Sequence, residues 1–193
     1  MKRRDTLWPN AEDLVFDDKA GGWAPIPRVV PLVAGLINNL DRVNAGHLYT
    51  VLWARNFGTG LVEVHDPVLL AFESGYAKTA GRAERTFRER IEVLCELRFI
   101  ETKPRGTRAH AYVLLHDPHR AVLRLHEERP DSFPKGWFEH FALRCDEIGV
   151  DLAQFRGVVA AGDDEMQDEP PATRRRRTSR TRKKPRRRSP EAD

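Results

Sequence analysis

The chain has 193 residues, with 33 Lys/Arg and 29 Asp/Glu, and its formal net charge is +4. This length fits one domain of ordinary size with additional segments. No apolar run reaches the roughly 18 residues of a transmembrane helix, and the basic N-terminus "MKRRDTLWPNAEDL" lacks the apolar stretch of a signal peptide. We therefore expect a cytoplasmic protein, nucleoid-associated in a bacterium, without a membrane partner.

Positive charge is concentrated in two segments. Residues 173–193 contain 11 Lys/Arg and two Asp/Glu, whereas the rest of the chain has a net charge of −5. Within that acidic remainder, residues 77–110 have a net charge of +4. Charges spread at random would not separate in this way, so both basic segments are candidates for contact with a polyanion.

In chain order, we interpret residues 1–27 as an irregular arm. Two segments with apolar residues at helical spacing follow, "RVVPLVAGLINNLD" (28–41) and "AGHLYTVLWARNF" (45–57). In the second segment, the apolar stripe runs through Leu48, Val51, Leu52 and Ala54, and "GTG" ends the helix.

The segment "LVEVHD" (61–66) alternates apolar and polar residues, which is typical of a short strand. Asp66 and Pro67 then have the residue types of a helix N-cap and first turn, in front of "VLLAFES".

The next predicted helix, 81–97, has two contrasting faces. Its apolar face consists of Ala83, Phe87, Ile91, Leu94 and Leu97. Arg82, Arg85 and Glu89 lie on the opposite face, and Thr86 lies near its edge. The pattern then becomes extended in "RFIETK" and "AHAYVLL", which we predict as two strands joined by the turn "PRGTR".

A second Asp-Pro pair begins the predicted helix "DPHRAVLRLHEE", and "PKGWFEHFALRCDEIG" is a further amphipathic helix that ends at Gly149. The helices at 28–41 and 134–148 either complete a monomer core or form the dimerisation surface of a homodimer. From Gly162 onward the apolar periodicity is lost. We therefore expect a disordered tail, first acidic and then basic, over residues 161–193.

Residues 45–115 thus run helix, strand, helix, helix, strand, basic turn, strand. This order resembles the winged helix-turn-helix family of DNA-binding domains, and "RTFRERIEVLCELRFIE" (85–101) resembles a recognition helix that leads into the first strand of a wing. The flanking helices resemble, more loosely, those of small regulators or replication and maintenance proteins of bacterial plasmids and integrative elements. The resemblance implies a mainly α fold with a small β-hairpin wing, and places a winged-helix core at 45–116 within a domain spanning 28–160.

A helix in the major groove meets base edges with residues near its N-terminus, and the wing at 104–109 would lie beside it. The residues that we expect to contact DNA are Lys78, Thr79, Arg82, Arg85, Thr86, Arg88, Glu89, Arg105 and Arg108. Arg88 is the least clear of these, because it lies toward the side of the helix.

Several of these residues have a second interpretation. Arg85 and Glu89 are four positions apart and would also suit a helix-surface ion pair. Arg98 either caps the helix C-terminus or touches DNA. Arg105 and Arg108 serve DNA contact, dimerisation or neither.

The tail sequence "RRRRTSRTRKKPRRR" contains no apolar residue, which excludes an amphipathic membrane helix. Its cations would displace counterions from phosphates and so strengthen DNA binding without adding sequence preference. They are Arg174, Arg175, Arg176, Arg177, Arg180, Arg182, Lys183, Lys184, Arg186, Arg187 and Arg188.

Signals for catalysis are weak. His116 and His119 are a close pair without a second pair of ligands at metal-binding spacing, and "GTG" at 58–60 lacks the Lys-Ser/Thr of a phosphate loop. Cys95 and Cys145 fall in apolar helical patterns, as reduced core thiols do. We expect no enzyme activity, no cofactor and no metal.

The predicted function is sequence-specific binding of double-stranded DNA, with transcriptional regulation as its use. Replication or segregation of a mobile element is the alternative use. The alternative from another class is a winged-helix protein-interaction module whose tail binds nucleic acid non-specifically.

Overall fold

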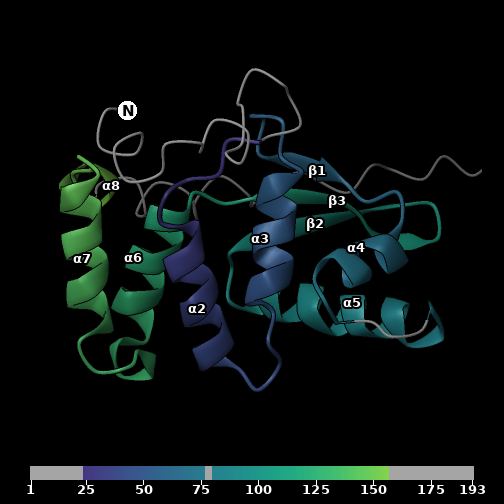
Figure 1. Cartoon of the computed structure of the whole chain (residues 1–193), viewed down its shortest axis with the longest axis horizontal. Coiled ribbons are helices and arrows are strands. Elements are labelled where there is room, and N and C mark those ends of the chain that lie inside the picture. Colours follow the sequence, from purple (N-terminus) through teal and green to yellow (C-terminus); the bar gives the residue numbers. More distant parts are fainter. Residues whose placement is uncertain (1–23, 77–79, 157–193) are drawn as a thin grey trace, which may run out of the picture. The chain divides into compact units, whose positions relative to one another are not determined.

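The computed structural model describes residues 24–76 and 80–156 (Figure 1). The chain divides into two compact units, Met1–Ala160 and Ala161–Asp193, and every described residue belongs to the first. The predicted arm up to residue 23 and the predicted tail at 161–193 lie outside the described residues.

The described part of the chain is mainly helical and contains one small antiparallel sheet. Its elements in chain order are α2 (Val30–Leu40), α3 (Gly46–Ala54), β1 (Leu61–Glu63), α4 (Pro67–Glu73), α5 (Ala80–Glu96), β2 (Ile100–Arg105), β3 (Arg108–Leu115), α6 (Pro118–Glu128), the 3-10 helix η3 (Pro130–Ser132), α7 (Trp137–Glu147) and α8 (Ala153–Arg156). The predicted fold class, mainly α with a small β-hairpin, is therefore confirmed for the helical content and for the hairpin. None of the helices between residues 24 and 156 combines the length and apolar character needed to cross a bilayer.

The three strands are arranged in the order β1-β3-β2. Val62 of β1 is aligned with Val113 of β3, and both are buried, whereas the next cross-strand pair, Leu61 and Leu114, faces outward. The register of β2 against β3 is irregular between Lys103 and Arg105, where Pro104 has no N–H to donate to the ladder. The β2–β3 hairpin continues beyond β1 and brings Arg105 opposite Arg108 at its tip.

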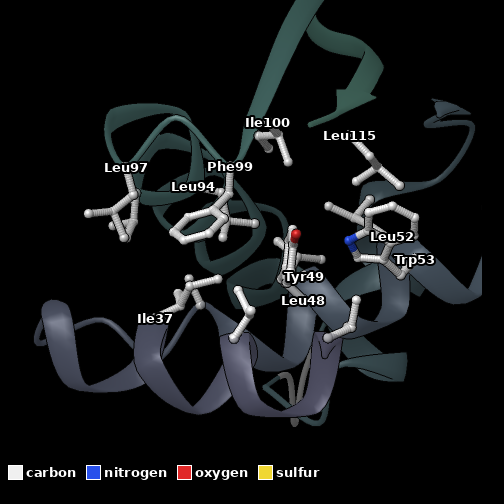
Figure 2. Close-up of a cluster of buried hydrophobic side chains, with 14 of the residues drawn as sticks. Ile37, Leu48, Tyr49, Leu52, Trp53, Leu94, Leu97, Phe99, Ile100 and Leu115 are labelled. Atoms are coloured by element: carbon white, nitrogen blue, oxygen red, sulfur yellow. The ribbon is translucent and has the colours of Figure 1, made fainter. Parts of the chain in front are cut away.

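The core is formed by α2, α3, α5 and the inner face of the sheet. All five residues of the predicted apolar face of α5 are buried. Figure 2 shows Tyr49 of α3 close to Phe99, which leads into β2, and their ring centroids are 5.5 Å apart in an edge-to-face arrangement. The apolar stripe predicted for α3 is partly wrong, because Ala54 is exposed while Tyr49 and Trp53 are buried instead.

Both predicted Asp-Pro helix starts are confirmed. The Asp66 carboxylate accepts hydrogen bonds from the amides of Val68 and Leu69, at 2.9 and 3.1 Å. The Asp117 carboxylate accepts from the amides of His119 and Arg120 at the same two distances. These bonds satisfy amides that have no partner inside the helix.

The end of α5 leads directly into β2 through a left-handed residue. Arg98 has φ 53°, the amide of Phe99 donates to the carbonyl of Leu94, and the amide of Arg98 donates to that of Cys95. This is the Schellman arrangement, with arginine in the place that glycine usually fills. The Arg98 side chain forms an ion pair with Glu128 of α6 at 3.0 Å, and Arg124 donates to the Arg98 carbonyl.

The flanking helices α2 and α7 contribute side chains to the core of this single chain. Val33 and Ile37 of α2 are buried, as are Phe141 and Cys145 of α7. Helix α2 contacts α3 on one side and α6 on the other (Figure 1). Both cysteines are free thiols, as predicted. Of the two alternatives for the helices predicted at 28–41 and 134–148, the structure agrees with the first, in which they complete the core of a monomer.

Gly46 marks a close approach between α3 and α2. A Cβ at this position would lie 2.0 Å from the Ala34 carbonyl oxygen, so the two helices would have to separate. We predict that Gly46→Ala lowers the free energy of unfolding by roughly 1–3 kcal/mol, measured by chemical denaturation. Gly35, in the middle of α2, is the matched control, because a Cβ there meets nothing within 4 Å. Gly35→Ala should raise the free energy of unfolding by about 0.5–1 kcal/mol. Similar losses of stability in both variants would contradict a close contact between α2 and α3 at Gly46.

Asp117 links helix capping to pH. Burial alone would raise the pKa of its carboxyl, but the hydrogen bonds from His119 and the Arg120 amide lower it below the ordinary value of 3.8. The charged form is therefore favoured by folding, and its contribution to stability is present above that value and lost as the pH falls through the lowered pKa. We predict that Asp117→Ala costs about 0.5–2 kcal/mol at neutral pH and progressively less in acid.

The matched control is Asp117→Asn, which keeps an oxygen that accepts from both amides but cannot titrate. It should retain most of the stability and lose the acid dependence. Denaturation curves at neutral and acid pH measure both effects, and an unchanged acid dependence in both variants would argue against this role of Asp117.

Candidate nucleic-acid interface

The exposed face of α5 carries its charges in an unusual order. Arg82, Arg85, Arg88 and Glu84 are exposed in the first half of the helix, whereas the exposed charges of the second half are the carboxylates of Glu92 and Glu96. The first turn contains no acidic residue and the last turn contains no basic residue. A helix is stabilised by the reverse arrangement, because its N-terminus carries a partial positive charge and its C-terminus a partial negative charge. The charges of α5 therefore do not serve the stability of the helix alone.

The arginines on this face are held by weak ion pairs. Arg85 donates through Nε to Oε1 of Glu89 at 2.8 Å, so the ion pair considered for these two residues is present. Arg88 lies 3.7 Å from the carboxylate of Glu84. Exposed pairs of this kind contribute only about 0.3–0.5 kcal/mol, and can exchange one partner for another at little cost.

Thr86 is buried, which differs from its predicted place near the edge of the exposed face of α5. It is only 8% exposed, and its carbonyl accepts a hydrogen bond from Arg90. The guanidinium of Arg90 also stacks over the ring of Tyr76 at 3.9 Å. Thr86 therefore lies in the interior, whereas Arg90 makes its contacts with Tyr76 and with the backbone of α5.

The tip of the β2–β3 hairpin carries two arginines that face each other. Arg105 and Arg108 are exposed cross-strand partners on either side of the turn at Gly106 and Thr107. Gly106 has φ 61°, which suits glycine. Like charges directly opposite each other destabilise a hairpin unless an anion lies between them.

A bridge from Arg108 fixes the hairpin against the loop between β1 and α4. Its guanidinium donates to the carbonyl of His65 at 3.1 Å. The hairpin, this loop and α5 together line one groove with a volume of about 590 Å³. Arg88 and Arg108 thus reach the same groove from two different elements.

His65, Thr107 and His110 also line this groove and are not among the predicted contact residues. The only signal for Thr107 was its place in the predicted turn. Burial lowers the pKa of His110, and its Nδ1 lies 3.0 Å from the hydroxyl of Thr102. The lowered pKa favours the neutral form of His110, and the permanent positive charges of the groove are Arg88 and Arg108.

The predicted contact residues fall into three groups. Arg82, Arg85, Arg88 and Glu89 are on the outer face of α5, and Arg105 and Arg108 are at the hairpin tip. Thr86 is buried. Lys78, Thr79 and the tail cations from Arg174 to Arg188 lie outside the described residues.

The two closely spaced histidines have separate hydrogen-bond partners. His116 contacts the carbonyl of Arg98 through Nδ1 at 2.9 Å, whereas His119 lies 3.3 Å from the Asp117 carboxylate. Within residues 24–76 and 80–156, no three His, Cys, Asp or Glu side chains are grouped in a way that could hold a metal ion.

Comparisons with known proteins give no match: no family model, no curated protein and no solved structure matches the chain. The candidate interface is therefore judged on its geometry and charge.

We predict that Arg105→Glu stabilises the hairpin by about 0.2–1 kcal/mol, because it replaces a repulsive cross-strand pair with an attractive one. The midpoint of thermal unfolding measures this change, which should shrink at high salt. Arg105→Gln removes the repulsion without adding attraction and should give an intermediate value. A loss of stability in Arg105→Glu would show that the two arginines do not oppose each other in solution.

Proposed function

We propose that the protein binds double-stranded DNA in a sequence-specific manner and acts as a transcriptional regulator. In this proposal α5 enters the major groove, and the β2–β3 hairpin is a wing that contacts the adjacent backbone. The observation that carries the proposal is the charge order of α5, since Arg82 and Arg85 are exposed in its first two turns, toward the end where the helix dipole favours an anion.

The order of elements supports assigning this core to the winged helix-turn-helix family. Helices α3, α4 and α5 and strands β1, β2 and β3 follow one another in the order that resembles the family. The apolar face of α5 is buried and its opposite face is exposed. The major groove is about 12 Å wide and admits an α-helix, whose N-terminal residues then meet the base edges.

The hairpin would add contacts to phosphates. Arg105 and Arg108 repel each other across the hairpin tip, and a phosphate between them would relieve that repulsion. The bond from Arg108 to the His65 carbonyl joins the tip to the loop between β1 and α4. The tip, this loop and α5 line one groove, so the hairpin and α5 would approach one duplex together.

The basic segment at 174–188 would supply additional affinity without sequence preference. If six to ten of its cations contact phosphates and release counterions, the affinity for DNA falls by roughly 10³–10⁵-fold between 50 and 200 mM salt. At high salt, the specific contribution of α5 should therefore dominate.

Protein binding is a second candidate function, because apolar side chains are exposed at one edge of the sheet. Phe57 is 93% exposed and lines the same hollow as Leu61, whose cross-strand neighbour Leu114 is also exposed. In this case the sheet edge would contact a protein, and the basic tail would bind nucleic acid without sequence preference.

The test is a selection of DNA sequences by the full-length protein from a random duplex library, at roughly 200 mM salt with excess non-specific DNA. We expect one motif to be enriched, and we expect the double variant Arg82→Ala, Arg85→Ala to abolish the enrichment. Residual binding by this variant should be equal for all sequences.

The matched control is Arg144→Ala, which removes an exposed arginine from an ion pair with Glu147 on α7. It should leave the motif unchanged. If the wild-type protein enriches no sequence and binds all DNA equally, the sequence-specific proposal fails and the protein-binding function becomes the better candidate.

A further inference from the structure

The ion pair between Arg85 and Glu89 points to the base pair that α5 would select. We infer that these two side chains read one G·C base pair together: the Arg85 guanidinium binds the guanine, and the Glu89 carboxylate accepts a hydrogen bond from the cytosine amino group. This inference rests on the proposed function and adds the chemical identity of the target.

The geometry of the pair sets its reach. Nε of Arg85 and Oε1 of Glu89 are 2.8 Å apart. Successive base pairs are separated by roughly 3.4 Å along the helix axis, so two groups this close can reach the edge of the same base pair. The contact uses Nε and Oε1, and leaves the two terminal nitrogens of Arg85 and Oε2 of Glu89 for other partners.

The chemistry of the two groups matches one base pair best. Guanine presents two acceptors, O6 and N7, to the major groove, and they suit the two terminal nitrogens of an arginine. Cytosine presents the N4 amino group, which suits a carboxylate. A carboxylate beside the acceptors of guanine or the O4 of thymine would be repelled. Glu89 therefore adds discrimination as well as attraction.

Arg85 is better suited to this role than Arg88 or Arg90. Its side chain is 83% exposed, compared with 59% for Arg88. The guanidinium of Arg90 is already used on Tyr76 and on the carbonyl of Thr86. The ion pair with Glu89 is weak, so Arg85 can keep it or exchange it at little cost when the guanine contact forms.

The experiment uses the motif selected by the full-length protein and measures Kd for duplexes that carry each of the four base pairs at every position. The wild-type protein should prefer G·C at one position by about 10-fold or more. Arg85→Ala should remove most of this preference at that position alone. Glu89→Gln should reduce the ratio of Kd values between T·A and G·C at that position. In the T·A pair adenine replaces cytosine, and the amide of glutamine can form hydrogen bonds to adenine.

Glu147→Gln is the matched control, since it neutralises the carboxylate of an equally short exposed pair, 2.9 Å from Arg144, on a different helix. It should leave every preference unchanged. A motif whose preferences survive both α5 variants, with only a uniform change in affinity, would overturn this inference and leave the proposed function standing. The absence of any motif in the wild-type protein would overturn both.

Discussion

The burial of one face of α5 is the constraint on which the rest of the structure depends. Ile91 and Leu94 pack into the interior formed by α3 and the sheet, and they leave the opposite face of the helix exposed. The core thus fixes the rotation of α5 about its own axis, and this rotation decides that Arg85 faces outward. The same burial brings the N-terminal half of α5 beside the β2–β3 hairpin, so that packing and charge together define the candidate interface.

The sequence predicted those elements whose signal is local. Helix α5 follows from five apolar residues at a 3.6-residue period, and the starts of α4 and α6 follow from Asp-Pro pairs that cap their own helices. The hairpin follows from strand-like alternation on both sides of a turn with Gly106. The outward orientation of Arg82 and Arg85 follows from the same periodicity, since both residues lie on the face of the helix opposite the buried one.

Contacts between distant segments could not be predicted in this way. Thr86 is buried, although a helical wheel of α5 places it near the edge of the exposed face, because the wheel does not include the segments that pack around the helix. The bond from Arg108 to His65 joins residues 43 positions apart, and it creates one wall of the groove. Ala54 was predicted on the apolar stripe of α3 but is exposed, whereas Tyr49 and Trp53, which the prediction left out, are buried, because the packing of α3 against the rest of the core decides which of its residues face inward.

The left-handed Arg98 has a consequence for how this protein tolerates change in length. Only three residues separate the last residue of α5 from the first residue of β2, and their backbone hydrogen bonds fix the turn. Adding one residue there would either rotate the helix by about 100° relative to the hairpin or place the inner side chains of β2 on the outer face of the sheet. The helix and the hairpin are therefore coupled in register, and this stretch of the chain should accept substitutions much more readily than insertions or deletions.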